Sequence, residues 1–320
     1  MNLNRSVPIE RGLGPCRVQR CNTYSKNIGW VHRTNRNSCN GLSRGQVQSR
    51  TRAEPKNGQD NDRPEIAVVL RDRIKDGLEK VPRAPWGVDT VLTVMLVWVV
   101  CFWISAYNVV PQALVFVKQH VFGRPLSLSE SLALRHLLLD GSQIVCIGIL
   151  LNRALKQYSP RSLGLFRVQV SSKRAWIAIA MGLVLFPCVD YLHRFIVSLT
   201  THTPLGADGI SSAHAKMFGD HGSLARVLWF LVLGVVAPVW EEVIFRGFLL
   251  PSLAQLFSPI VGICLTALVF SLVHFTTEGF LPLMILGIIF GASYCATANL
   301  FPAIMLHSLW NICLLVQVLS

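Results

Sequence analysis

The chain has 320 residues, of which 52% are hydrophobic and 15% charged, and its mean hydropathy is +0.46. This composition excludes an ordinary soluble domain and leaves room for roughly six to eight membrane spans of about 20 residues plus one soluble extension. The net charge of +13 is concentrated in residues 1–53, which carry ten Lys or Arg and one acid, but no folded basic module follows that would favour nucleic-acid binding.

Residues 1–60 form a basic leader that is rich in Arg, Asn and Ser. A secretory signal requires an apolar stretch, and this segment has none of even eight residues. Leaders that carry Arg and Ser and few acids are typical of organelle import, so we expect a disordered transit peptide. The predicted location is a chloroplast membrane, with a mitochondrial or endoplasmic reticulum membrane as the alternative. A plain disordered basic tail is the simpler interpretation of the leader itself.

A short amphipathic helix is predicted over residues 61–85. Ile66, Leu70, Ile74 and Leu78 recur every four residues and are flanked by Arg and Lys. One apolar stripe beside a basic flank is typical of a helix that lies on the membrane surface. A helix docked on the protein itself would have the same pattern.

Seven apolar runs follow, and they predict transmembrane helices at about 88–110, 132–152, 175–195, 224–246, 259–276, 280–298 and 301–318. We therefore expect an all-α, polytopic transmembrane helical bundle of about seven or eight helices. Within it, residues 86–222 hold the N-terminal helices and loops, and residues 223–318 form the catalytic core. The basic connection 153–174 indicates the stromal, matrix or cytosolic side of the membrane.

Two details concern how these helices meet. The segment Phe248–Phe257 is too short to cross a bilayer and is expected to be re-entrant or interfacial. Gly287 and Gly291 are four residues apart, which gives the run 280–298 a smooth face for close helix packing.

Charged side chains are rare in the last 96 residues, which contain only five. Three of them, Glu241, Glu242 and Arg246, lie within six positions inside a long apolar run. Each would cost about 2.5–3.5 kcal/mol at the centre of a bilayer. A Leu at each position would insert better, so the cluster predicts an intramembrane functional site.

Helical geometry assigns different directions to these side chains. Glu242 and Arg246 are four apart with the acid first, which favours an ion pair within the helix. Glu241 is rotated by about 100° from its neighbour and points elsewhere. Pro238 lies three residues upstream and is expected to loosen the helix there.

Two later apolar runs each carry a histidine. Phe270 and His274 share one helical face, and His307 and Asn311 share another. We expect these groups to meet the Glu-Glu-Arg cluster in one cavity.

Such a set suits two kinds of chemistry. A buried carboxylate can act as a general base toward water, while a His and an Asn on one face can stabilise an oxyanion. Alternatively Glu241, His274 and His307 could bind zinc with an open fourth position. A serine nucleophile is disfavoured because Ser271 and Ser308 point away from the neighbouring histidines. The nine cysteines form no C-x-x-C pair, and we expect no disulfide framework.

Taken together, Glu241-Glu242-x-x-x-Arg246, Phe270-x-x-x-His274 and His307-x-x-x-Asn311 resemble the three motifs of the CAAX prenyl protease 2 family. This group is also called the CPBP intramembrane proteases and includes bacteriocin-processing and self-immunity proteins. The resemblance covers residues 223–318. It implies an endopeptidase within the membrane, whose type member removes the last three residues of prenylated CAAX proteins.

The resemblance also implies roles for the site residues. Glu241 and His274 would activate the hydrolytic water, and His307 and Asn311 would hold the oxyanion. The supporting residues would be Glu242 and Arg246, which orient the site, and Phe270. The resemblance leaves a zinc mechanism open. We favour the metal-free version without a cofactor, because it employs every polar residue of the set.

The expected partners are a membrane-anchored protein or peptide substrate and the lipid bilayer, without nucleic acid. Two other functions fit the same residues. A catalytically silent scaffold or chaperone would bind partner helices through surfaces such as the Gly287/Gly291 face. An ion-coupled transporter would employ the buried acids and histidines as relays, but the sequence has no internal repeat to support it.

Overall fold

The computed structural model describes residues 84–160, 162–201 and 222–319. The predictions for the leader 1–60 and nearly all of the amphipathic helix 61–85 lie outside these residues. The described part of the chain consists of helices, turns and loops without a strand, which confirms the all-α class.

The helices before residue 202 belong to three long rods. The first comprises α2 (Val88–Ile104), a π-helical segment (Ser105–Val109), α3 (Val110–Val117) and a second π-helical segment (Lys118–Phe122). The second is α4 (Leu128–Leu155), which ends in a 3₁₀ turn (Lys156–Tyr158), and the third is α5 (Lys173–Thr201). A Ser127 capping box starts α4, because Ser127 and Glu130 satisfy each other's backbone N–H groups.

The helices after residue 221 carry the predicted catalytic core. One rod comprises α7 (Ser223–Leu231), the π-helical segment η4 (Val232–Val236), α8 (Ala237–Glu242), the π-helical segment η5 (Val243–Leu249) and α9 (Leu250–Leu256). It is followed by α10 (Pro259–Leu272), α11 (Phe280–Thr297) and α12 (Leu300–Leu319).

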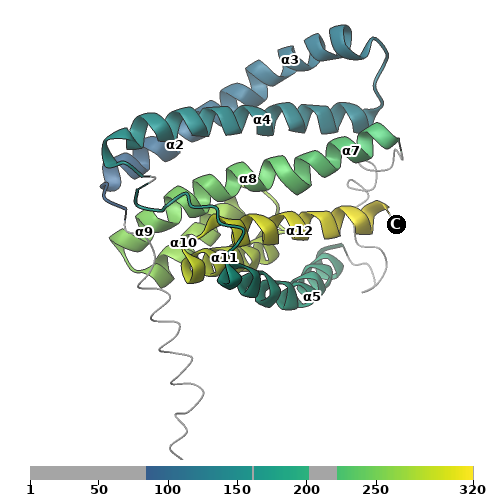
Figure 1. Cartoon of the computed structure of the whole chain (residues 1–320). Helices are drawn as coiled ribbons and strands as arrows, with labels where there is room; N and C mark the ends of the chain where they lie inside the picture. Colours follow the sequence, from purple (N-terminus) through teal and green to yellow (C-terminus); the bar gives the residue numbers. More distant parts are fainter. Residues whose placement is uncertain (1–83, 161, 202–221, 320) are drawn as a thin grey trace, which may run out of the picture. The chain divides into compact units, whose positions relative to one another are not determined.

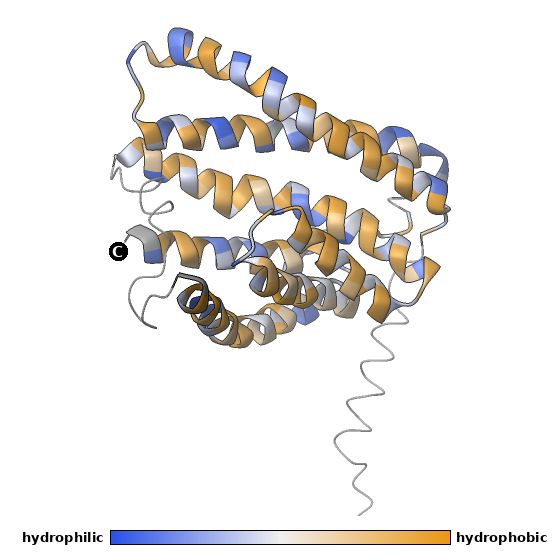
Figure 2. Cartoon of the chain, turned by 180° about the vertical axis from the view of Figure 1, so that it is seen from behind, coloured by the Kyte–Doolittle hydropathy of each residue, from blue (hydrophilic) through white to orange (hydrophobic). Residues whose placement is uncertain are grey.

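Six of these rods are long and apolar enough to cross a membrane within the described ranges, which supports an integral membrane protein. Figure 2 shows that hydrophobic residues predominate along them. The fifth predicted span, 259–276, is wrong in length, because α10 has 14 residues and is therefore about 21 Å long. The prediction of a separate segment Phe248–Phe257 is also wrong, since the rod that begins at Ser223 continues to Leu256.

Prolines explain three of the four π-helical segments in the described residues. Pro111, Pro238 and Pro251 each lie two residues after such a segment. Proline has no N–H group and its ring clashes with the carbonyl four residues earlier. The wider π turn relieves that clash, so the helix continues without a sharp break. The loosening predicted at Pro238 is therefore present as η4.

The rods are arranged around the α7–α8–α9 helix (Figure 1). On one side it contacts α4, which in turn contacts α2 and α3. On the other side it contacts α12, and α11 lies between α10 and α5. Trp86, before α2, contacts Tyr158, after α4, with 5.7 Å between ring centroids. The beginning of the first predicted span and the end of the second therefore lie at the same end of the helical bundle.

The two glycines of α11 have a packing role. A Cβ atom on Gly287 would lie 2.9 Å from the Cα atom of Ala267 in α10, and one on Gly291 would lie 3.3 Å from Ile263. This confirms the prediction of close helix packing at the Gly287/Gly291 face. Because α10 covers that face, it is not free to bind a partner helix.

Candidate active site

A fully buried ion pair forms the base of the site. Arg246 Nη1 donates to Glu242 Oε1 at 2.9 Å, and both side chains are 0% exposed. Arg246 Nη2 also donates to the carbonyl oxygen of Gly287 at 3.1 Å. The predicted pair is therefore present, and it ties the α8–η5 junction to α11.

Aromatic rings surround the guanidinium group. The Arg246 Cζ atom lies 4.6 Å from the ring centroid of Phe270 and 5.4 Å from that of Phe290. A desolvated cation over an aromatic face is stabilised by the ring quadrupole. Phe290 also stacks on His307, with 5.2 Å between centroids. These rings fix the Arg and His planes and keep the base of the site apolar.

His307 comes from α12 and is held by the same acid. Its Nδ1 atom lies 2.8 Å from Glu242 Oε1, so we assign the proton to Nδ1 because a carboxylate can only accept. The Nε2 atom of His307 then lies on the opposite edge of the ring, 3.9 Å from Glu241 Oε2.

His274 follows the end of α10 and is arranged in the same way. Its Nδ1 atom lies 2.6 Å from the Phe270 carbonyl oxygen, which assigns the proton to Nδ1 again. Its Nε2 atom lies 3.9 Å from Glu241 Oε2. The side chain is 30% exposed, so this side of the site opens outward.

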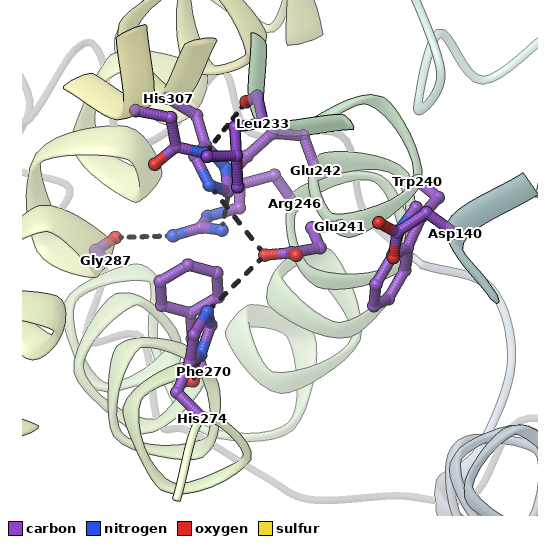
Figure 3. Close-up of polar contacts among 11 residues, drawn as sticks. Asp140, Leu233, Trp240, Glu241, Glu242, Arg246, Phe270, His274, Gly287 and His307 are labelled. Carbon is purple, nitrogen blue, oxygen red and sulfur yellow. Dashed lines mark hydrogen bonds and ion pairs between the residues drawn. The ribbon is translucent and has the colours of Figure 1, made fainter. Parts of the chain in front are cut away.

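Glu241 therefore stands between two imidazole rings, as Figure 3 shows. Its Oε2 atom is buried and has no hydrogen-bond partner among the described residues. With both Nδ1 atoms protonated, neutral His274 and His307 present only acceptors toward this oxygen. Three acceptors that face one another require a donor between them, and water has two O–H groups to offer.

Asn311 lies one turn beyond His307 on α12. Its Nδ2 atom donates to the Leu233 carbonyl oxygen at 3.0 Å. Leu233 lies in η4, and its partner in the π register would be residue 238, which is proline and cannot donate. One amide hydrogen of Asn311 thus satisfies a carbonyl group that Pro238 leaves without its π-helical partner, and the second remains for another acceptor.

The structure thus brings together all of the predicted site residues. Glu241, Glu242, Arg246, Phe270, His274 and His307 are linked by the contacts above, and Asn311 is anchored beside them on α12. Sequence reasoning did not identify Asp140 and Trp240, whose side chains flank Glu241 (Figure 3). An acid inside the apolar run 132–152 was a usable signal, because such residues are rare in transmembrane helices.

The predicted zinc ligands lie too far apart for a tetrahedral site. Tetrahedral zinc with ligands at about 2.0–2.1 Å brings ligand atoms to about 3.3 Å of one another. Here Glu241 Oε2 is 3.9 Å from both Nε2 atoms. Within the described residues, no group of three or more His, Cys, Asp or Glu is arranged to hold a metal ion. The residues as placed do not fit a three-ligand zinc site, so no step below passes through a metal.

Comparison with known proteins identifies one family. Residues 223–313 match the model of the family described as type II CAAX prenyl endopeptidase Rce1-like. The matched segment begins with α7, ends within α12 and contains every predicted site residue. It confirms the predicted resemblance and supports a CAAX-protease type of function in general terms. No curated protein and no solved structure matches the chain.

Proposed function

We propose that the chain is an intramembrane endopeptidase in which Glu241 activates water for attack on a peptide bond. The observation that carries this proposal is the approach of one unpartnered carboxylate oxygen to the Nε2 atoms of His274 and His307, 3.9 Å from each. The family match to residues 223–313 supports a CAAX-type endopeptidase as the reaction class.

The first step is addition of water to the carbonyl carbon. Water donates one hydrogen to Glu241 Oε2 and the other to His274 Nε2, which directs an oxygen lone pair at the substrate. As the new C–O bond forms, Glu241 takes the proton, and the carbonyl electron pair moves onto the substrate oxygen.

Stabilisation of the resulting oxyanion falls to α12. Neutral His307 carries its proton on Nδ1 and has no hydrogen on Nε2 for the oxyanion. His307 therefore enters the substrate complex as imidazolium, whereas the neutral ring belongs to the site without substrate. Glu242 accepts from Nδ1 and compensates that charge. The second amide hydrogen of Asn311 is the other donor. Removal of one such donor typically lowers kcat by about 10²–10³.

Collapse of the intermediate completes the reaction. The oxyanion's electron pair re-forms the C=O bond as the C–N bond breaks and Glu241 returns its proton to the leaving nitrogen. The hydroxyl proton of the new acid then passes through His274 Nε2 to the amine, which yields one carboxylate and one ammonium group. Glu242 and Arg246 touch no reacting atom in this scheme. They hold His307 and the α8–η5 backbone in place.

The substrate is proposed from the family description to be a membrane-anchored protein with a lipid-modified C-terminus. A chloroplast location, which the described residues do not test, would require a different membrane protein as substrate.

The test is cleavage of peptides by the full chain in proteoliposomes. A farnesylated CAAX peptide and an unmodified apolar peptide would be compared for wild type, Glu241→Gln and His274→Leu. We expect wild-type turnover of at least one peptide, with a loss of at least about 10³-fold in Glu241→Gln. Tight peptide binding without cleavage by wild type, unchanged in Glu241→Gln, would instead support a silent scaffold.

A further inference from the structure

Asp140 is a buried acid that the proposed reaction does not employ. It lies in α4, outside the segment that matches the family, and it is 7% exposed. Its Oδ1 atom accepts a hydrogen bond from the indole Nε1 of Trp240 at 3.2 Å. An ionisable residue inside a transmembrane helix is costly and indicates a function by default.

Trp240 is the residue immediately before Glu241, and two other helices hold it. Asp140 fixes the indole N–H from α4. Trp98 in α2 packs against the ring, with 6.0 Å between centroids and an interplanar angle of 45°. The Trp240 side chain is therefore positioned by two helices of the N-terminal half.

Glu241 has no such contact of its own through Oε2. On a helix its two neighbours are rotated by about 100° in opposite directions. Glu242 is anchored by Arg246 and His307, and Trp240 is anchored by Asp140. Both flanks of Glu241 are thus fixed. Figure 3 shows Asp140 and Trp240 on the side of Glu241 away from the two histidines.

We propose that Asp140 is a positioning residue that orients Glu241 through its hydrogen bond to Trp240. The inference rests on the proposed function. A misplacement of about 1 Å in a reacting group can cost about 10²-fold in rate, so a loss of this anchor falls on kcat rather than on substrate binding.

The chain offers a matched control at the same helix pair. Trp229 Nε1 donates to Ser129 Oγ at 3.2 Å, again between the α7–α8–α9 helix and α4. This contact lies 11 residues before the Asp140–Trp240 contact on both helices. It docks the same helices about 18 Å from Glu241 along the helix axis.

The experiment compares four single variants of the full chain, and the double variant Asp140→Leu/Trp240→Phe, in proteoliposomes. Asp140→Leu removes the acceptor, Trp240→Phe removes the donor, and Asp140→Asn keeps a carbonyl acceptor without the charge. Trp229→Phe is the control. We expect Asp140→Leu and Trp240→Phe each to lower kcat by about tenfold or more, with KM within about twofold. The kcat of the double variant should be no lower than that of the slower single variant. The kcat of Asp140→Asn should stay within about threefold of the wild-type value, and that of Trp229→Phe within about twofold.

Three results would overturn the proposal. The first is turnover by Asp140→Leu at the wild-type rate, and the second is an effect of Asp140→Leu that multiplies with that of Trp240→Phe. The third is turnover by Asp140→Asn as slow as that of Asp140→Leu while Trp240→Phe turns over normally. The last result would assign the effect to charge instead of the hydrogen bond. A wild type that cleaves no peptide refutes the proposed function separately. In that case the ¹⁵N indole resonance of Trp240, assigned by its absence in Trp240→Phe, tests the hydrogen bond between Asp140 and Trp240. Its chemical shift must change in Asp140→Leu and remain unchanged in Asp140→Asn.

Discussion

Replacement of Arg246 by Met is predicted to destabilise the protein far more than the same replacement of Arg194. Both arginines form an ion pair with an acid four residues earlier, and both pairs have a nitrogen–oxygen distance of 2.9 Å. The difference lies in burial. Glu242 and Arg246 are 0% exposed, whereas the side chains of Asp190 and Arg194 are 26% and 46% exposed.

The magnitude follows from what each substitution leaves behind. Arg246→Met leaves the Glu242 carboxylate buried without its cation and the Gly287 carbonyl without its donor. Removing one partner of a buried pair costs about 3–5 kcal/mol, so we expect about 4 kcal/mol. The Asp190–Arg194 pair is partly exposed, and loss of an exposed pair costs at most about 1 kcal/mol.

The assay is thermal unfolding of the purified full-length variants in one detergent, followed by circular dichroism. Since 1 kcal/mol shifts Tm by about 2–4 °C in a protein of this size class, we expect a drop of about 8–16 °C for Arg246→Met. The drop for Arg194→Met should not exceed about 4 °C. The double variant Glu242→Leu/Arg246→Met should recover part of the loss, because neither charge is then buried alone. Equal shifts for the two single variants would refute the assignment of the stabilising effect to burial.

Five further substitutions have defined outcomes in the same assay. Gly287→Val should cost about 2 kcal/mol or more by forcing α11 away from α10, whereas Gly148→Ala, whose Cβ meets nothing within 4 Å, should stabilise α4 by about 0.5–1 kcal/mol. Phe275→Gly should raise the free energy of unfolding by up to about 1 kcal/mol, because Phe275 has φ +51° and is 86% exposed. Phe257→Gly is the control and should lower the free energy of unfolding, because Phe257 has φ −120°. Asn311→Leu should cost about 1–2 kcal/mol by leaving the η4 carbonyl group without a donor. A lower Tm for Gly148→Ala than for Gly287→Val, or for Phe275→Gly than for Phe257→Gly, would contradict these expectations. So would an unchanged Tm for Asn311→Leu.

The apolar runs and the motif spacing were sufficient to predict the helical class and most of the candidate site. The i, i+4 spacing of Glu242 and Arg246 predicted their pair, and the shared faces of Phe270/His274 and His307/Asn311 predicted which groups converge. These are local properties of a helix, and they depend on residue spacing alone.

Features that depend on tertiary packing were not predictable in this way. The rod was expected to end near Arg246, but it continues to Leu256. The π-helical segment η5 ends two residues before Pro251 and lets the helix pass a residue that breaks a regular α-helix. Asp140 was visible only as an interruption of an apolar run. Its contact with Trp240 joins residues 100 positions apart, and no periodicity within one helix specifies such a pair.

The orientation of the two histidine rings could not be predicted from the sequence either. Spacing placed His274 and His307 near the acids but did not indicate which nitrogen faces Glu241. The Phe270 carbonyl and Glu242 occupy the two Nδ1 atoms, so both Nε2 atoms point to one carboxylate oxygen.

Water that Glu241 activates should leave one of its oxygen atoms in the cleaved peptide. Mass spectrometry can follow that oxygen in a farnesylated CAAX peptide and an unmodified apolar peptide, each incubated in H₂¹⁸O with full-length wild type or Glu241→Gln in proteoliposomes. We expect one ¹⁸O atom in a newly formed carboxylate with wild type, and intact peptide with Glu241→Gln of equal thermal stability. Product formation by Glu241→Gln at the wild-type rate, or no product with folded wild type for either peptide, would contradict this mechanism.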